Sequence, residues 1–163
     1  MPKSLWAPWR LEYIAQADEQ EGCALCAEAS GAVDEAESLL VHAGDRTIVL
    51  LNKYPYSSGH LMVAPVRHIG EYGELAAEEV HELHRLSSAG MGALAQIYAP
   101  QGYNVGWNLG RIAGAGVVDH VHLHVVPRWA GDTNFMPVLA DVKVLPEHLA
   151  ETRRRLAEAW PPS

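Results

Sequence analysis

The run His120-Val-His-Leu-His-Val-Val126 constrains this 163-residue chain more than any other segment. Imidazole and aliphatic side chains alternate along it, and in a β-strand successive side chains point to opposite faces. We therefore predict a strand over 120–126 whose Val121, Leu123 and Val125 enter the core. The other face of this strand would carry three histidines at intervals of about 6.6 Å.

This histidine face admits three interpretations. Neutral imidazole is the commonest metal ligand, so two of the histidines could hold a catalytic metal. Alternatively, one histidine is a nucleophile toward phosphorus, because an imidazole with a pKa near about 6.5 is mostly neutral at neutral pH and forms a cleavable phosphoramidate. An incidental polar strand face is the third interpretation, which strict alternation of three histidines disfavours. The glycine-rich segment 108–116 upstream is either an anion nest of backbone N–H groups, which favours phosphorus chemistry, or an ordinary loop.

The other elements follow from hydrophobic periodicity and turn residues. We predict strands at 39–42, 47–51, 60–65 and 103–107, with a Gly-Asp turn at 43–46 closing the first hairpin. Apolar spacing of three to four residues predicts a long helix over 75–98 and a last helix that begins at Pro146-Glu147 and ends before Pro161. The expected fold class is therefore α+β, a mostly antiparallel sheet with a long helix and a C-terminal helix packed on it.

Composition limits the partners that this chain can have. With 12 Lys and Arg against 20 Asp and Glu, the net charge is −8, which argues against binding a nucleic-acid backbone. No apolar run approaches the roughly 18 residues of a membrane span, so we expect a soluble protein without a membrane partner. The first ten residues lack the pattern of a signal peptide, which favours a cytoplasmic location. The length favours a single domain.

Both cysteines lie in one local motif, Cys23-Ala-Leu-Cys26. In a reducing compartment such a pair is more typical of a metal or redox site than of a structural disulfide. A redox-active dithiol and two buried thiols remain alternatives, although the βαβ context of a thioredoxin-like motif is absent. Four other histidines, which have no evident partner or lie on a charged helix face, receive no function: His42, His81, His84 and His148.

The alternating histidine run, with its two following apolar residues, resembles the signature of the histidine triad (HIT) superfamily. Further segments are similar to the diadenosine tetraphosphate phosphorylase (ATP adenylyltransferase) branch of that superfamily. These segments are Leu50–Tyr56, Gly59–Pro65, Gly102–Gly106, Asn108–Gly110 and Val126–Phe135, with Trp6–Arg10, Tyr13, Lys143–Val144 and Thr152–Arg153 toward the ends. The resemblance implies a HIT-like fold, one HIT domain over 1–163 with a core at about 23–135, a homodimer and a small-molecule nucleotide substrate.

The resemblance also implies roles for individual residues. His122 would attack the α-phosphorus of a diadenosine polyphosphate or related adenine nucleotide, with His124 contacting phosphate oxygens and assisting the leaving group, and His120 in support. Substrate contacts or their bracing would come from Asn52, His60, Asn108, Ala115, Gly116 and Trp129, the last being equally compatible with a core or interface position. Gly116 stands where many members have Gln and some phosphorylases have Ser. A dinucleoside polyphosphate hydrolase, a nucleoside phosphoramidase and a non-catalytic nucleotide sensor therefore remain alternatives.

The same resemblance implies that the cysteine motif is part of a metal site with two further ligands. Some HIT proteins and related uridylyltransferases hold a structural zinc, and here its ligands would be Cys23, Cys26, His68 and His120. Two thiolates and two imidazoles make a closed tetrahedral site, which is structural rather than catalytic. The expected cofactor is one structural zinc ion per chain.

Overall fold

The computed structural model of the chain describes residues 22–132 and 147–162. Four of the segments that carry the resemblance fall outside these ranges, wholly or in part: Trp6–Arg10, Tyr13, Lys143–Val144 and the end of Val126–Phe135. The predicted helix start at Pro146 also lies outside the described residues.

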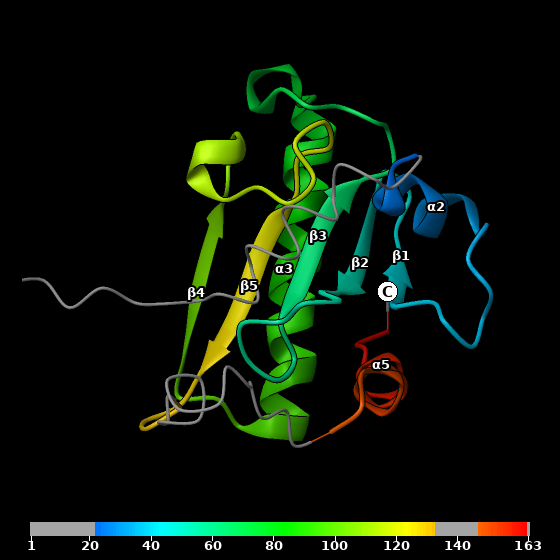
Figure 1. The fold of residues 1–163 in the computed structure, drawn as a ribbon. Coiled ribbons are helices and arrows are strands. Elements are labelled where there is room, and N and C mark those ends of the chain that lie inside the picture. The colour runs from blue at the N-terminus through cyan, green and yellow to red at the C-terminus, as the bar shows by residue number, and fades with distance from the viewer. Residues whose placement is uncertain (1–21, 133–146, 163) are drawn as a thin grey trace, which may run out of the picture.

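The described residues form one five-stranded antiparallel sheet in the order β1-β2-β3-β5-β4 (Figure 1). The strands are β1 Leu40–Ala43, β2 Thr47–Leu51, β3 Leu61–Pro65, β4 Gly102–Trp107 and β5 Leu123–Arg128. The strand that carries the last triad histidine therefore lies inside the sheet, with His124 opposite Met62 of β3 and Gly106 of β4. This arrangement confirms the α+β class and the mostly antiparallel sheet.

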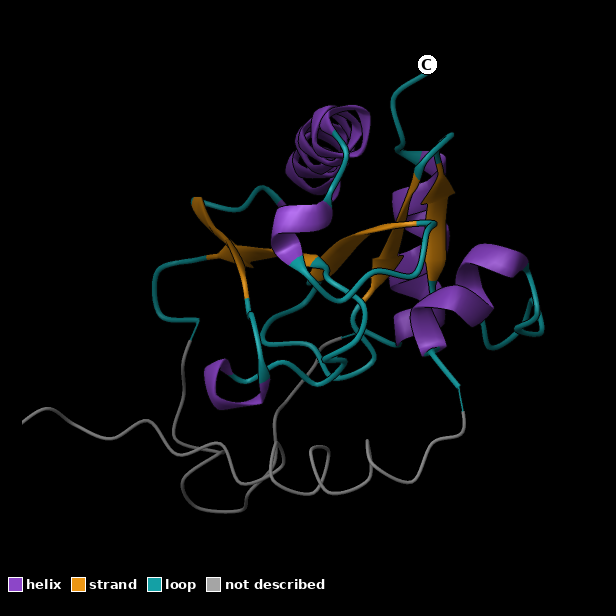
Figure 2. Ribbon diagram, turned by 90° about the horizontal axis from the view of Figure 1, so that it is seen from above, coloured by secondary structure: helices purple, strands orange, loops and turns teal. Residues whose placement is uncertain are grey.

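Helices cover the sheet unequally. The longest, α3 (Ala77–Tyr98), packs along one face, and Figure 2 shows it on the opposite side of the sheet from the short helix η2 (Arg111–Ala113). The C-terminal helix α5 (Leu149–Glu158) packs against β1, β2 and α3, as predicted from its apolar spacing. A second short helix, η1 (Tyr72–Glu74), precedes α3.

Strand β2 shows how the two faces are filled. All five of its residues are buried. Val49 and Leu51 belong to the main core under α3, whereas Ile48 and Leu50 pack with Leu25 of helix α2 (Ala24–Ser30) on the other face. A strand covered on both faces reads as a continuous apolar run rather than an alternating one, which is the pattern of residues 47–51.

Helix α2 has no counterpart among the predicted elements. It begins after Cys23, its N-cap, and ends before its C-cap Gly31, which adopts φ 70° and whose backbone N–H donates to carbonyls of the last turn, as is typical of a left-handed C-cap. The sequence contains signals of this helix: the helix-forming residues alanine, leucine and glutamate, followed by a glycine that can end a helix. At seven residues the segment is too short for helical periodicity to be decisive.

The last helix begins later than predicted. Its first residue is Leu149 and its N-cap is His148, so Glu147 lies before the helix rather than at its start. Glu147 instead accepts hydrogen bonds from the hydroxyls of Tyr98 and Thr152 and from the Arg155 guanidinium. These tertiary bonds tie the segment before α5 to the end of α3, which a propensity argument does not detect.

The predicted strand over 120–126 also needs correction, because β5 starts only at Leu123. The preceding segment leaves the ladder: the N–H of Val121 donates to the Ile69 carbonyl at 2.8 Å, and His120 Nε2 lies 2.8 Å from the Pro65 carbonyl oxygen. Val121, Leu123 and Val125 are nevertheless buried as predicted. The three triad imidazoles therefore do not form one evenly spaced row.

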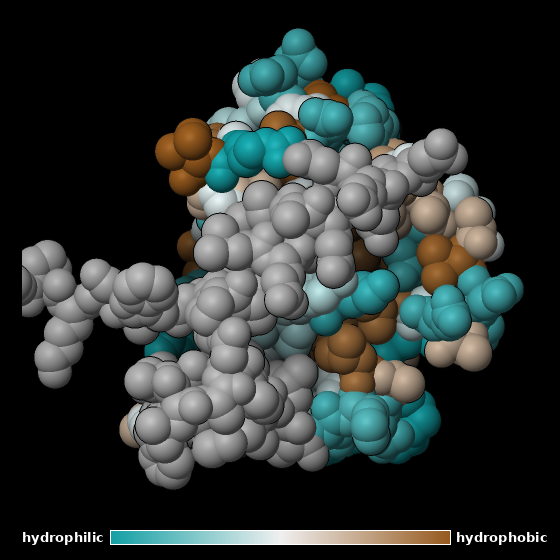
Figure 3. All heavy atoms as spheres, viewed as in Figure 1, coloured by the Kyte–Doolittle hydropathy of each residue, from teal (hydrophilic) through white to brown (hydrophobic). Residues whose placement is uncertain are grey.

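Apolar side chains stay exposed around the edge strand β4. Val105, Leu109 and Ile112 are about half exposed or more, and Figure 3 shows apolar atoms over η2, the helix that carries Ile112. Within the described ranges, no helix is both long and apolar enough to cross a membrane.

Glu82 of α3 is a buried carboxylate that holds the β1–β2 turn. Its oxygens accept hydrogen bonds from the N–H groups of Asp45 and Arg46 and from the Thr47 hydroxyl, at 3.2, 2.6 and 3.1 Å. Burial alone would raise the pKa of Glu82, but these bonds and the one from Arg85 outweigh it and lower the pKa below its ordinary 4.5. The carboxylate form therefore stabilises the fold.

Replacing this carboxylate with an amide is expected to destabilise the protein in a pH-dependent way. Glu82→Gln should lower the free energy of unfolding by about 1.5–3 kcal/mol near about pH 7, since hydrogen bonds to a charged group are lost. A depressed folded-state pKa contributes stability above pH 4.5, and this contribution is lost as the pH falls through the folded-state pKa. The deficit should thus shrink near about pH 3, measured by urea unfolding.

Glu78→Gln, an exposed change on the same helix, serves as the matched control and should leave stability nearly unchanged. An equal deficit for Glu82→Gln at both pH values would show that packing rather than charge explains the effect.

Candidate functional site

The triad histidines lie on the side of the sheet away from α3. Leu123 and Val125 point into the core under α3, so His124 between them points to the opposite face. The rings of His122 and His124 are 4.8 Å apart and nearly perpendicular, at 74°. Both side chains are buried, with 6% and 7% exposed. The structure thus brings two of the three triad rings into contact.

The hydrogen bonding of His122 fixes which ring nitrogen carries its proton. Its Nδ1 lies 2.9 Å from the backbone carbonyl oxygen of His120. A carbonyl only accepts, so Nδ1 must donate and the lone pair resides on Nε2. Burial lowers the pKa of His122 below its ordinary 6.5, which favours the neutral ring. A neutral imidazole with an available Nε2 lone pair is a competent nucleophile.

The tautomer of His124 follows from a chain of donors that starts at the backbone. The N–H of Tyr56 donates to His60 Nδ1 at 3.0 Å, so the proton of neutral His60 lies on Nε2. That Nε2 is 3.0 Å from His124 Nδ1, which must therefore accept. The proton of His124 is then on its own Nε2. Beside the Nε2 lone pair of His122, the structure thus presents an N–H donor.

Asn108 completes this chain. Its side-chain amide lies 3.3 Å from His124 Nε2 and 3.5 Å from the Tyr56 hydroxyl, both through the position assigned to Nδ2. The oxygen and nitrogen of an amide are assigned from the hydrogen-bond network, and the N–H of His124 requires an acceptor. We therefore assign Oδ1 of Asn108 to this position, where it accepts from both His124 and Tyr56.

The loop that carries Tyr56 and His60 is constrained at two neighbouring points. The hydroxyl of Ser57 donates to the Pro127 carbonyl of β5 at 2.8 Å. Gly59 adopts φ +75°, and a Cβ there would lie only 2.6 Å from Leu94 Cδ2 of α3. Glycine is thus required where this loop passes over the helix.

Of three other predicted substrate contacts, Asn52 and Ala115 have hydrogen-bond partners within the chain. Asn52 follows β2, where its backbone N–H donates to the His60 carbonyl and its Oδ1 accepts from the N–H of Tyr54. The N–H of Ala115 donates to the Gly110 carbonyl at 3.2 Å, within its own loop, and Gly116 is half-buried. A phosphate nest built from the Ala115 amide would therefore require this loop to change conformation.

The structure does not bring Trp129 to the triad within one chain. Its indole N–H donates to the Tyr98 carbonyl at the end of α3, at 3.1 Å. Trp129 follows His124 by five positions, roughly 17 Å along an extended strand.

Tyr56 is a site residue that the sequence analysis did not identify. Its ring lies 4.7 Å from that of His60 and 5.9 Å from that of His124. The available signal was an aromatic residue four positions before His60 in a short loop between two strands.

His120, the first of the triad histidines in the chain, faces a different set of partners. Its Nδ1 lies 3.3 Å from the Cys23 sulfur and 3.5 Å from the Cys26 sulfur, and Cys26 is in turn 3.3 Å from His68 Nδ1. The four donor atoms all lie within 4.8 Å of one another. Sulfur and nitrogen ligands of a tetrahedral zinc ion lie about 3.5 Å apart, given the usual bond lengths. The cluster therefore has the dimensions of a zinc site.

Protonation in this cluster also suits a cation. His120 Nε2 donates to the Pro65 carbonyl, which leaves the Nδ1 lone pair directed at the cysteines, and burial lowers the pKa of His120. Burial, together with the adjacent Cys23 sulfur, raises the pKa of the Cys26 thiol, an effect that a bound cation would reverse. The residues present thus match a two-thiolate, two-imidazole site.

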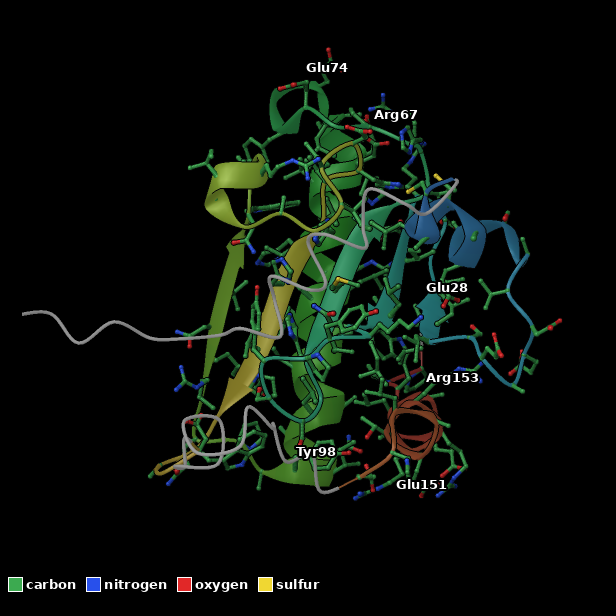
Figure 4. The ribbon with its side chains drawn as sticks, viewed as in Figure 1. Glu28, Arg67, Glu74, Tyr98, Glu151 and Arg153 are labelled. Carbon is green, nitrogen blue, oxygen red and sulfur yellow. The ribbon has the colours of Figure 1, made fainter. Side chains whose placement is uncertain are left out.

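The chain next to His68 is anchored from the other side. The guanidinium of Arg67 bonds both carboxylate oxygens of Glu79 and the Glu74 carbonyl, at 2.9 to 3.0 Å (Figure 4). These bonds hold the segment after β3 against the start of α3. The exposed His68 ring therefore projects from a fixed backbone.

His120 is shared between the two clusters. Its ring meets the cysteines, while its backbone carbonyl accepts the proton of His122. The cysteine cluster and the nucleophile candidate are thus linked through residues that lie two positions apart in the sequence.

Comparison with known proteins agrees with this geometry. The HIT domain family matches residues 33–131. The chain is 38% identical to AP-4-A phosphorylase of Mycobacterium tuberculosis, over 96% of this chain and 83% of the relative. It is also 34% identical to adenosine 5'-monophosphoramidase hnt1 of Schizosaccharomyces pombe, over 50% of this chain and 58% of that protein.

Solved structures give the same result for the fold. A Zn-bound histidine triad family protein from Mycobacterium smegmatis superposes with a TM-score of 0.67 at 26% identity, over 85% of this chain and 92% of the other. The family match, the similarity to the M. tuberculosis protein over nearly the whole chain and the shared fold agree with one another. The chain belongs to the HIT domain family.

Proposed function

We propose that this protein is a diadenosine tetraphosphate phosphorylase that works through a nucleotidyl-histidine intermediate. The observation that carries the proposal is the pairing of a lone pair on His122 Nε2 with an N–H on the adjacent His124. The M. tuberculosis relative, named AP-4-A phosphorylase, supports the choice of substrate.

The reaction would proceed in two displacements. His122 Nε2 attacks an α-phosphorus, a nitrogen–phosphorus bond forms, and the phosphorus–oxygen bond to ATP breaks, so that ATP leaves as an anion. Inorganic phosphate then attacks the same phosphorus, releases ADP and returns the electron pair to His122. A polyphosphate anion needs little protonation to leave, so positioning and charge stabilisation supply most of the catalysis.

The neighbouring residues divide the supporting work. His124 would donate its N–H to the phosphate oxygens or the leaving group, with His60 fixing its tautomer. Asn52 would bind the ribose, and the loop with Asn108, Ala115 and Gly116 would contact phosphates. His120 would hold the orientation of His122 through its carbonyl. The roles of His60 and of the His120 carbonyl rest on the hydrogen bonds described above. The ribose, phosphate and leaving-group contacts, and a contact from Trp129, are assignments by resemblance.

The proposal includes one structural zinc ion per chain, held by Cys23, Cys26, His68 and His120. Such an ion supplies no bond-making chemistry; it fixes the segment that leads into the catalytic strand. The Zn-bound M. smegmatis structure supports this part of the proposal.

We further propose a cytoplasmic homodimer without a nucleic-acid or membrane partner. Two free cysteines suit a reducing compartment, and the net charge of −8 disfavours a polynucleotide. Edge strand β4, with exposed Val105 and neighbouring Leu109 and Ile112, offers a surface for a second copy.

Product analysis separates the candidate activities. In phosphate buffer, the phosphorylase should convert diadenosine tetraphosphate to ADP and ATP, because phosphate attacks the adduct. AMP and ATP regardless of phosphate would instead identify a hydrolase. Tight binding without products would identify a sensor. Faster cleavage of adenosine 5'-phosphoramidate than of the dinucleotide would favour the phosphoramidase activity, which the S. pombe relative motivates.

A further inference from the structure

Tyr56 contacts His124 and both of the residues that hydrogen-bond to its ring, His60 and Asn108. Its backbone N–H orients His60, its ring lies against the rings of His60 and His124, and its hydroxyl reaches the amide of Asn108. None of the roles assigned above uses its side chain. A hydroxyl both donates and accepts, so it can add a hydrogen bond to the orientation of the amide that a neighbouring group selects.

The amide of Asn108 has two possible orientations. With Oδ1 toward the histidine, it accepts from His124 Nε2–H and from the Tyr56 hydroxyl. With Nδ2 in that place, two N–H donors would confront each other, because the tautomer of His124 is fixed by His60. The His124 N–H therefore selects the first orientation. By donating to Oδ1, the Tyr56 hydroxyl adds a second hydrogen bond that holds the amide there.

We propose that Tyr56 is a positioning residue whose hydroxyl holds the Asn108 amide with Oδ1 toward His124, and thereby keeps the His124 N–H directed into the site. This inference deepens the proposed function and rests on it for its kinetic consequence. The contacts of 3.3 and 3.5 Å are long, as is common in sites without substrate, and would tighten when a nucleotide is bound.

The role of the hydroxyl is tested with Tyr56→Phe, which keeps the ring. We expect kcat for diadenosine tetraphosphate to fall about 5- to 20-fold while KM changes by less than about 2-fold, since the hydroxyl orients a donor rather than binds substrate. By NMR, the His124 Nε2–H proton should exchange with water at least about 5-fold faster, because its acceptor is no longer held. The absence of this signal in His124→Gln assigns it.

A double-mutant cycle tests whether Tyr56 acts through Asn108. Where Asn108→Ala has already removed the amide, adding Tyr56→Phe should change neither kcat nor proton exchange further. Tyr103→Phe is the matched control, because the Tyr103 hydroxyl donates to the Met91 carbonyl instead. This control should leave both readouts at their wild-type values.

The outcomes separate this inference from the proposed function. Unchanged exchange and kcat in Tyr56→Phe, or equal losses with and without the Asn108 amide, would overturn the positioning role. If the wild-type protein does not cleave the dinucleotide, the proposed function fails, whereas the NMR cycle still decides the role of Tyr56.

Discussion

Replacing His122 with alanine is expected to reduce turnover of diadenosine tetraphosphate by about 10⁴-fold or more, as for removal of other nucleophiles. The substitution removes the only protein atom proposed to form a bond with phosphorus. Nucleotide binding should change little, because the proposed contacts through Asn52, Asn108 and His124 remain. Steady-state kinetics and equilibrium binding of the dinucleotide provide the two measurements.

Two observations complete this test. His81→Ala, which removes an exposed histidine on α3, should retain full activity. In phosphate-free buffer, intact-mass measurement should detect a nucleotidyl adduct on the wild-type chain and none on His122→Ala. Activity of His122→Ala within about tenfold of wild type would eliminate the nucleophile assignment.

Replacing Cys23 with serine is expected to have the largest effect on stability. Zinc content should fall from about one ion per chain to near zero, because a serine hydroxyl is a poor substitute for a thiolate. The free energy of unfolding should fall by about 3 kcal/mol or more, since metal binding contributes to folding. Metal analysis and urea unfolding measure these changes.

A chelator provides the comparison for this variant. Chelation should lower wild-type stability to the level of Cys23→Ser and leave the variant itself unaffected. Metal-free wild type of undiminished stability would contradict the structural zinc site. Immediate loss of turnover on chelation, with no adduct trapped, would favour a catalytic metal on the triad instead.

The parts of the fold that were predictable are those whose pattern is local. Alternation identified the buried residues Val121, Leu123 and Val125, and a continuous apolar run identified β2. The end of the ladder before Leu123 was not predictable in this way. It depends on contacts of His120 and Val121 with residues that are distant in sequence. These are the backbone carbonyls of Pro65 and Ile69 and the two cysteine sulfurs.

The site was predictable to a similar extent. The triad and the cysteine pair follow from residue type and spacing, whereas His68 and His120 were added as metal-ligand candidates by the resemblance alone. The proton positions follow from neither, because they depend on the Tyr56 N–H and on two backbone carbonyls. Backbone groups are the same in every sequence, so only the fold shows which of them reaches a side chain.

The close contact between Gly59 and Leu94 has a consequence for how this sequence can vary. Any side chain at position 59 would press on α3 as well as strain a backbone at φ +75°. The loop bearing Tyr56 and His60 is therefore not free to drift as surface loops usually are. The hydrophobic core below this loop, through Leu94, therefore limits which substitutions position 59 can tolerate.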